Sequence, residues 1–352
     1  MRAQYAALRR GVQRLEEVAA LYTTTELKKH LKSLLDYSEA LQIDSIKNLR
    51  PGTYSFVDYL DNDGITPQPV KINVTATIAD STAIIDFTGT DPIVRGPVNA
   101  PLSVTTAAVS YVFRALATAE HIPVNAGCLR PVTILVPEGC FLAAEYPAPV
   151  AAGNVETSQR VVDCLLGALS KAAPSVIPAA GQGTMNNFSV SGNLKGSEFS
   201  YYETIGGGMG AREGKNGTSG IHVHMTNTLN TPVEIIEYQF PFQITEYSIR
   251  KGSGGPGKCS GGNGIVRSFK FNAPCSASLL TERRIIRPYG LDGGKDGLAG
   301  GNWLVRGGNK AKLPGKCDLD LKKGDILLIE TPGGGGYGKA PYRTKKRPRA
   351  WL

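Results

Sequence analysis

A glycine-rich turn is followed by two histidines between residues 203 and 230, and these groups are well suited to proton transfer and ligand binding. The turn consists of three consecutive glycines, Gly206, Gly207 and Gly208. Glycine lets backbone N–H groups approach a ligand without a Cβ in the way. His222 and His224 would share one face of a β-strand, and with Glu203 they could transfer protons. The segment predicts the wall of a polar site, although a half-exposed strand after a flexible loop explains it equally well.

Two further polar clusters precede this segment. Residues 153–160 place Asn154 and Glu156 where a helix is expected to begin, and a helix N-terminus can bind an anion or oxyanion. Asn154 is equally what an ordinary N-cap requires. Residues 181–187 end in Asn186 and Asn187, whose amides could orient a carbonyl or carboxylate, but asparagine and glycine together favour a simple turn.

Several common sites are not predicted by this sequence. The glycine-rich loops lack the spacing of a P-loop or a dinucleotide fingerprint, so ATP binding by this chain is not expected. No Gly-x-Ser-x-Gly elbow occurs, which disfavours a serine hydrolase. Two histidines fall short of the three or four ligands of a usual metal site, and we expect no metal or other cofactor to be bound by this chain.

Composition indicates a globular protein without nucleic-acid or membrane binding. The net charge of +9 includes six basic residues in the acid-free tail 339–352, which we expect to be flexible, so the body is near-balanced. No apolar run is long enough to cross a membrane. The six scattered cysteines form no C-x-x-C pair and fit a reducing compartment, so a cytoplasmic location is expected.

Hydrophobic periodicity predicts an α+β fold: an N-terminal helical pair, a mixed but mostly antiparallel sheet packed by helices, and a β-rich C-terminal half. Apolar residues recur at helical spacing on both sides of the break at residues 23–25, and at a period of two in residues 70–78. The expected divisions are a helical segment at 1–50, an α/β core with the site at 51–230, and a β-rich region at 231–338.

Long collinear stretches of the chain closely resemble the hydantoinase B/oxoprolinase family. The matching stretches are residues 86–91 (DFTGTD), 95–99 (RGPVN), 125–131 (NAGCLRP), 153–163, 183–187 (GTMNN), 201–208 (YYETIGGG), 222–234, 252–255 (GSGG) and 331–338 (TPGGGGYG). The family comprises B-type subunits of ATP-dependent hydantoinases, the C-terminal region of 5-oxoprolinases, and related subunits of acetone and acetophenone carboxylases. The resemblance covers nearly the whole chain.

The resemblance implies a hydrolase of small cyclic amides such as hydantoins, 5-oxoproline or a similar lactam. An A-type partner subunit would handle ATP and Mg²⁺ and phosphorylate the amide oxygen, and this chain would help deliver water to the activated carbon. The implied ring site includes Asn154, Glu156, Glu203, His222, His224 and Asn227. A histidine would be the proton shuttle, a glutamate the base or orienting acid, and the glycine backbone the oxyanion donor.

One departure from the family pattern leaves alternatives open. Members normally begin with a further region containing His-x-x-Asp and His-His-x-Asp motifs that resemble divalent metal ligands, and this chain starts downstream of them. The chain would then be a split-gene product completed by a separate N-terminal B-type polypeptide, or a truncated or degenerate copy, and it would be inactive alone. A non-catalytic assembly module and a subunit of a carboxylase-like complex are the alternative functions.

Overall fold

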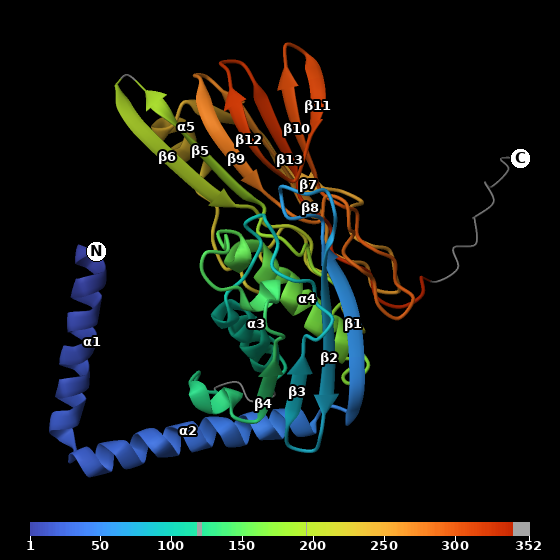
Figure 1. Ribbon diagram of the computed structural model, residues 1–352. Coiled ribbons are helices and arrows are strands. Elements are labelled where there is room, and N and C mark those ends of the chain that lie inside the picture. Colours follow the sequence, from blue (N-terminus) through green and yellow to red (C-terminus); the bar gives the residue numbers. More distant parts are fainter. Residues whose placement is uncertain (118–121, 195, 341–352) are drawn as a thin grey trace, which may run out of the picture.

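The computed structural model describes residues 1–117, 122–194 and 196–340 (Figure 1). The predicted tail at 339–352 falls outside the described residues from residue 341 onward. The fold is α+β, as the sequence predicts, and the strands in the described ranges form three sheets.

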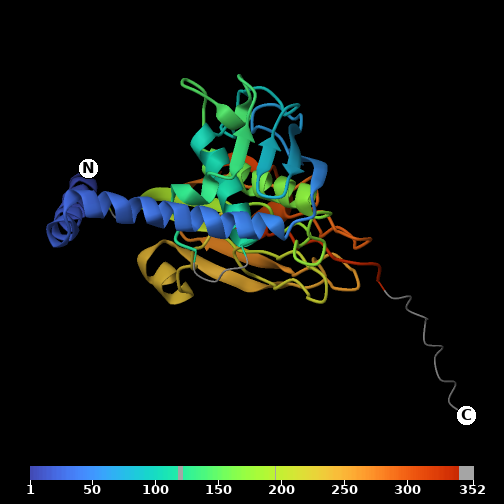
Figure 2. The same cartoon turned by 90° about the horizontal axis from the view of Figure 1, so that it is seen from below.

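Two helices form an N-terminal arm, which confirms the predicted helical pair. They are α1 (Arg2–Leu21) and α2 (Thr24–Lys47). The chain breaks between them because Thr23 begins a capping box: the Glu26 N–H donates to Thr23 Oγ1 at 3.2 Å, and the Thr23 N–H donates to Glu26 Oε2 at 2.9 Å. The C-terminal half of α2 buries Ser38, Gln42 and Ile46 against the body. Helix α1 buries none of its residues and lies beyond the end of α2 (Figures 1 and 2).

A four-stranded sheet and two helices form the first body of the fold. The strands run in the order β1 (Gly52–Leu60), β2 (Val70–Ile78), β3 (Ala83–Asp86), β4 (Val132–Leu135), and only β3 and β4 pair in parallel. In β2 the even-numbered residues are buried and their neighbours half-buried, as the period of two predicts. The helices are α3 (Leu102–Ala115) and α4 (Ser158–Leu169). Helix α4 is buried along its whole length, between the sheet and the second half of the chain.

Short helical turns connect these elements. Two are 3-10 turns, η1 (Ala126–Leu129) and η2 (Phe141–Ala143), and one is a π-helical turn, η3 (Gly153–Thr157), directly before α4. The expected helix start at Asn154 is therefore wrong in detail. The N-cap of the turn is Ala152, and no side chain among the residues described caps it.

Two antiparallel sheets enclose the second core. One has the order β12 (Lys316–Leu321), β9 (Cys275–Leu280), β5 (Asn187–Leu194), β6 (Ser197–Thr204). The other has the order β11 (Asn309–Leu313), β10 (Gly301–Arg306), β13 (Ile326–Glu330), β8 (Gly264–Phe271), β7 (Phe242–Arg250). Phe188, Phe242 and Phe269 are fully buried between them, beside α5 (Val233–Gln239). The expected division at residue 230 does not separate two sheets, because β5 and β6 share a sheet with β9 and β12.

Candidate functional site

A cavity of about 320 Å³ lies where α3, α4 and the loop at 221–224 meet. Its polar lining comes from Tyr111 near the end of α3 and from the two histidines, His222 and His224. Apolar side chains such as Leu166 and Met209 form much of the rest. A mostly apolar pocket with a few converging polar groups is typical of a small-molecule site.

The segment that carries the histidines is not a strand, so the prediction that both rings share one strand face is wrong. Ile221 forms a single bridge with Gly207, and the following residues are irregular. His224 has a φ of 58°, which lies in the left-handed region and turns the chain. The Gln159 side chain of α4 donates to the Val223 carbonyl at 3.1 Å and fixes the loop against that helix. Tertiary contacts, and not strand alternation, bring the two rings to one cavity.

His224 lies between a carboxylate and a phenol. Its Nε2 is 3.6 Å from Asp163 Oδ1, and its Nδ1 is 3.3 Å from the Tyr111 hydroxyl. Burial lowers the pKa of His224 below its ordinary value, and the Asp163 carboxylate opposes this effect. The imidazole is therefore neutral at pH 7. With the proton on Nε2 toward Asp163, Nδ1 is an acceptor for the Tyr111 hydroxyl.

Asp163 is itself held by a buried chain of charges. Arg283 Nη2 lies 2.9 Å from Asp163 Oδ2 and 2.7 Å from Asp58 Oδ2, and Arg160 Nη1 lies 3.5 Å from the same Asp58 oxygen. Asp163 Oδ1 accepts no hydrogen bond from the described residues, and it is the oxygen nearest to His224. Oδ1 of Asp163 is therefore free to orient the imidazole.

His222 has hydroxyl neighbours. Its Nδ1 is 3.3 Å from Thr226 Oγ1, and its Nε2 is 3.5 Å from Thr228 Oγ1. Partial burial lowers the pKa of His222, so this ring is also neutral at pH 7. Both histidines are suited to accept a proton near neutrality, and among the described residues a carboxylate lies beside His224 but not beside His222.

Glu156 and Asn187 form a separate buried cluster outside the cavity lining. Glu156 Oε1 accepts from Asn187 Nδ2 at 2.7 Å and from the Met185 N–H at 3.3 Å. Burial, with the nearby Glu282 carboxylate, raises the pKa of Glu156 to about 8. Asn186 has a φ of 48° and donates to Gln182 Oε1 at 2.8 Å. A protonated Glu156 is a poor base at neutral pH.

Glu203 is paired within the second core. Its Oε1 accepts from Arg267 Nη2 at 2.8 Å and from Asn230 Nδ2 at 2.7 Å. Burial raises the pKa of Glu203, and Arg267 opposes that shift. Glu203 does not line the cavity. These contacts give Glu203 a structural role as the partner of Arg267 and Asn230.

Asn154 and Asn227 are exposed, and neither lines the cavity. The structure therefore separates the predicted catalytic and amide residues into four places: the two histidines at the cavity, a buried group around Glu156, Glu203 in the second core, and two surface asparagines. Whether any of them takes part in catalysis stays a prediction.

The three glycines are buried, and two of their N–H groups already have backbone acceptors, so an oxyanion role for the turn stays a prediction that Gly207 and Gly208 do not support. The N–H groups of Gly207 and Gly208 donate to the carbonyls of Ile221 and Pro332 at 2.9 and 3.0 Å. A Cβ on Gly208 would lie 2.0 Å from the Gly262 carbonyl oxygen, and one on Gly206 would lie 2.9 Å from the Ile221 carbonyl carbon. Glycine is required there because backbones pack against one another.

Sequence reasoning missed Tyr111, Asp163 and the arginine that holds Asp163. One signal was present: Asp163 is the one acidic residue in the otherwise apolar run 161–166 (VVDCLL) of α4. A charge inside a fully buried helix requires a partner, and such positions often belong to functional sites.

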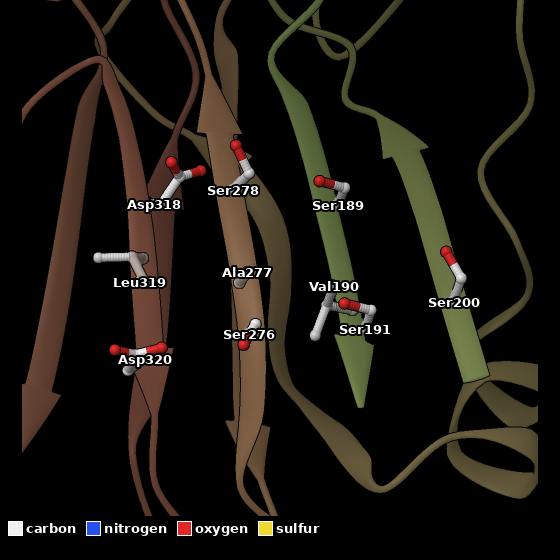
Figure 3. Close-up of a pocket in the computed structure, with 10 residues that line it drawn as sticks. All are labelled: Ser189, Val190, Ser191, Ser200, Ser276, Ala277, Ser278, Asp318, Leu319 and Asp320. Atoms are coloured by element: carbon white, nitrogen blue, oxygen red, sulfur yellow. The ribbon is translucent and has the colours of Figure 1, made fainter. Parts of the chain in front are cut away.

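A second hollow, of about 440 Å³, lies on the face of the β12-β9-β5-β6 sheet opposite the core (Figure 3). Strand register places Ser189, Ser278 and Asp318 in one row. Ser191, Ser276 and Asp320 form the next row. These hydroxyls and carboxylates are exposed or half-exposed, as on many wet sheet faces. We therefore place the candidate site at the histidine cavity.

In the described part of the chain, no three His, Cys, Asp or Glu side chains gather as metal ligands would. None of the helices described has both the length and the apolar character needed to cross a bilayer.

Comparison with known proteins identifies the family. The family model "Hydantoinase B/oxoprolinase" matches residues 1–340. The chain belongs to this family. It is 40% identical to 5-oxoprolinase 1 of Arabidopsis thaliana over 96% of its own length and 27% of that protein. It is 33% identical to a putative B-type subunit of a D-/L-hydantoinase from a Pseudomonas species over 99% of its own length and 60% of that protein.

A solved structure shares this fold. The crystal structure of an ATP-dependent caprolactamase from Pseudomonas jessenii superposes with a TM-score of 0.83 at 21% identity, covering 97% of this chain and 61% of that one. At that identity the likeness shows the fold alone. The chain thus spans about a quarter of the 5-oxoprolinase and about three fifths of the hydantoinase subunit that it matches.

Proposed function

We propose that this chain is a subunit of an ATP-dependent enzyme that opens a small cyclic amide, such as a hydantoin, 5-oxoproline or a related lactam. Family membership and the names of its relatives support the reaction class. The observation that carries the site is the neutral His224, held between Asp163 and Tyr111 at the edge of a cavity of about 320 Å³.

The chemistry of an unstrained amide explains the need for ATP. An A-type partner subunit, with Mg²⁺, phosphorylates the amide oxygen and makes the ring carbon electrophilic. Water then adds to that carbon and gives its proton to neutral His224. The protonated imidazole gives that proton to the ring nitrogen. The adduct then collapses to an acyl phosphate as the C–N bond breaks and its hydroxyl proton passes to the departing nitrogen, and a second water hydrolyses the acyl phosphate to carboxylate and phosphate.

The loop at 221–224 and α4 hold His224 in the orientation that this step needs. Asp163 fixes the ring orientation and stabilises the imidazolium when it forms, because its free oxygen lies 3.6 Å from Nε2. The apolar lining of the cavity excludes other water. A separate B-type polypeptide and a divalent metal are part of this proposal because the family resemblance implies them.

Single-residue variants in the complex with its A-type partner test the proposal. We expect His224→Ala to lower kcat by about 10²- to 10⁴-fold, the usual size of general acid–base catalysis. Asp163→Asn should lower kcat less, and His30→Ala, on the exposed arm helix α2, should leave turnover unchanged.

The pH profile gives a second readout. Since only neutral His224 can accept the proton, kcat should fall as the pH drops through the lowered pKa of this residue. Unchanged turnover in His224→Ala and His222→Ala would refute the catalytic part and leave an assembly role. Ring opening without ATP would refute the reaction itself.

A further inference from the structure

Helix α1 carries an apolar face that nothing in the described part of the chain covers. Tyr5, Leu8, Val12 and Leu15 are 64%, 70%, 58% and 58% exposed. The helix stands apart from the rest of the fold in both views (Figures 1 and 2). Soluble monomers rarely leave a continuous apolar row in water, so this face is expected to be an interface.

The spacing of this face is that of a coiled coil. Within α1, Tyr5, Leu8, Val12, Leu15 and Ala19 are separated alternately by three and four residues, and Val18 flanks this row. In a coiled coil these are the a and d positions of the heptad, which pack into holes on a neighbouring helix. An ordinary amphipathic helix that packs on a globular core usually has a wider apolar stripe.

The charges beside the apolar row of α1 indicate which helix it packs against and in which direction. Arg9 and Glu16 occupy successive e positions, and neither forms an ion pair with another described residue. In an antiparallel pair of identical helices, a positions meet d positions and e positions meet e positions. Val12 of one copy then faces Leu15 of the other, and Arg9 faces Glu16 twice, once on each side of the two-fold axis.

A parallel pair would not match these charges. There e positions meet g positions, so Arg9 would face Gln4 and Glu16 would face Gly11. In the antiparallel pair, g meets g, and Val18 packs over Gly11 of the other copy, where the helix leaves open space for it. We propose that α1 pairs with α1 of a second copy of this chain in an antiparallel coiled coil, which makes the protein a two-fold symmetric dimer.

Sedimentation equilibrium of the full chain tests the pairing. Wild type should be a dimer, and Val12→Asp should be a monomer. Arg9→Glu and Glu16→Arg should each raise the dissociation constant about tenfold by placing like charges together, and the double variant should restore it. A monomeric wild type would overturn the proposal, as would a double variant that stays weakened. Since α1 buries no residue, the thermal unfolding of the body should be the same in every variant.

Cysteine cross-linking tests the direction of the helices. A Cys317→Ser background removes the one native cysteine that is not buried. An equimolar mixture of Val12→Cys and Leu15→Cys chains should oxidise to a disulfide-linked dimer faster than either variant alone. Rapid cross-linking of Val12→Cys with itself would show a parallel pair and overturn the proposal.

Discussion

Replacing Glu156 by Gln should remove a large pH dependence of stability. Glu156 is fully buried, and its pKa is raised from 4.5 to about 8, first by burial and then by the Glu282 carboxylate. A carboxyl group whose folded pKa is raised contributes its full stability below the unfolded pKa and loses it as the pH rises toward the folded pKa. The relevant window is therefore pH 4.5 to 8.

The size of the effect follows from the two pKa values. Each unit of difference corresponds to about 1.4 kcal/mol, so Glu156 lowers the free energy of unfolding by about 1 kcal/mol at pH 5 and about 3 kcal/mol at pH 7. The Gln amide oxygen can still accept from Asn187 and from the Met185 N–H. The Gln NH₂ group takes the place of Glu156 Oε2, which has no hydrogen-bond partner among the described residues. Burying this NH₂ group lowers the free energy of unfolding by the same amount at every pH.

Urea unfolding of wild type and Glu156→Gln from pH 5 to pH 7.5 measures this difference. The stability of the variant relative to wild type should rise by about 2 to 3 kcal/mol between pH 5 and pH 7. Glu138 is exposed, so Glu138→Gln should give a curve parallel to wild type. A pH-independent difference between wild type and Glu156→Gln would refute the reasoning and show that Glu156 is ionised in the folded protein.

Four further outcomes are expected. Gly208→Ala should prevent recovery of folded protein, because its Cβ would lie 2.0 Å from a backbone oxygen. NMR titration should place the pKa of His224 below 6.5, and Asp163→Asn should lower it further; a rise would contradict the assigned pairing. Arg283→Met should cost about 3–5 kcal/mol in urea unfolding, because it leaves buried carboxylates unpaired, and a neutral effect would show that the charge chain is not formed. Turnover should not require bicarbonate, and a requirement would favour the carboxylase alternative.

The sequence by itself determined the family, the fold class and the local elements. The motifs at 201–208 and 331–338 identify the family, and the period of two in residues 70–78 predicts β2 because alternation depends only on neighbours along the chain. The helical pair was predictable for the same reason. The apolar spacing of α1 was also visible, but not the fact that the described part of the chain leaves this helix uncovered.

Only the tertiary structure decided which polar groups meet. His224 finds Asp163 and Tyr111 because the loop at 221–224 turns at a left-handed residue and packs on α4, and strand alternation could not predict that turn. Gly208 is a similar case. The spacing of the glycines suggests a loop that binds a ligand, but in the structure three segments distant in sequence pack their backbones together at Gly208. Local patterns are set by neighbouring residues, whereas the burial and charge partners of His224 and Glu156 depend on contacts across the fold.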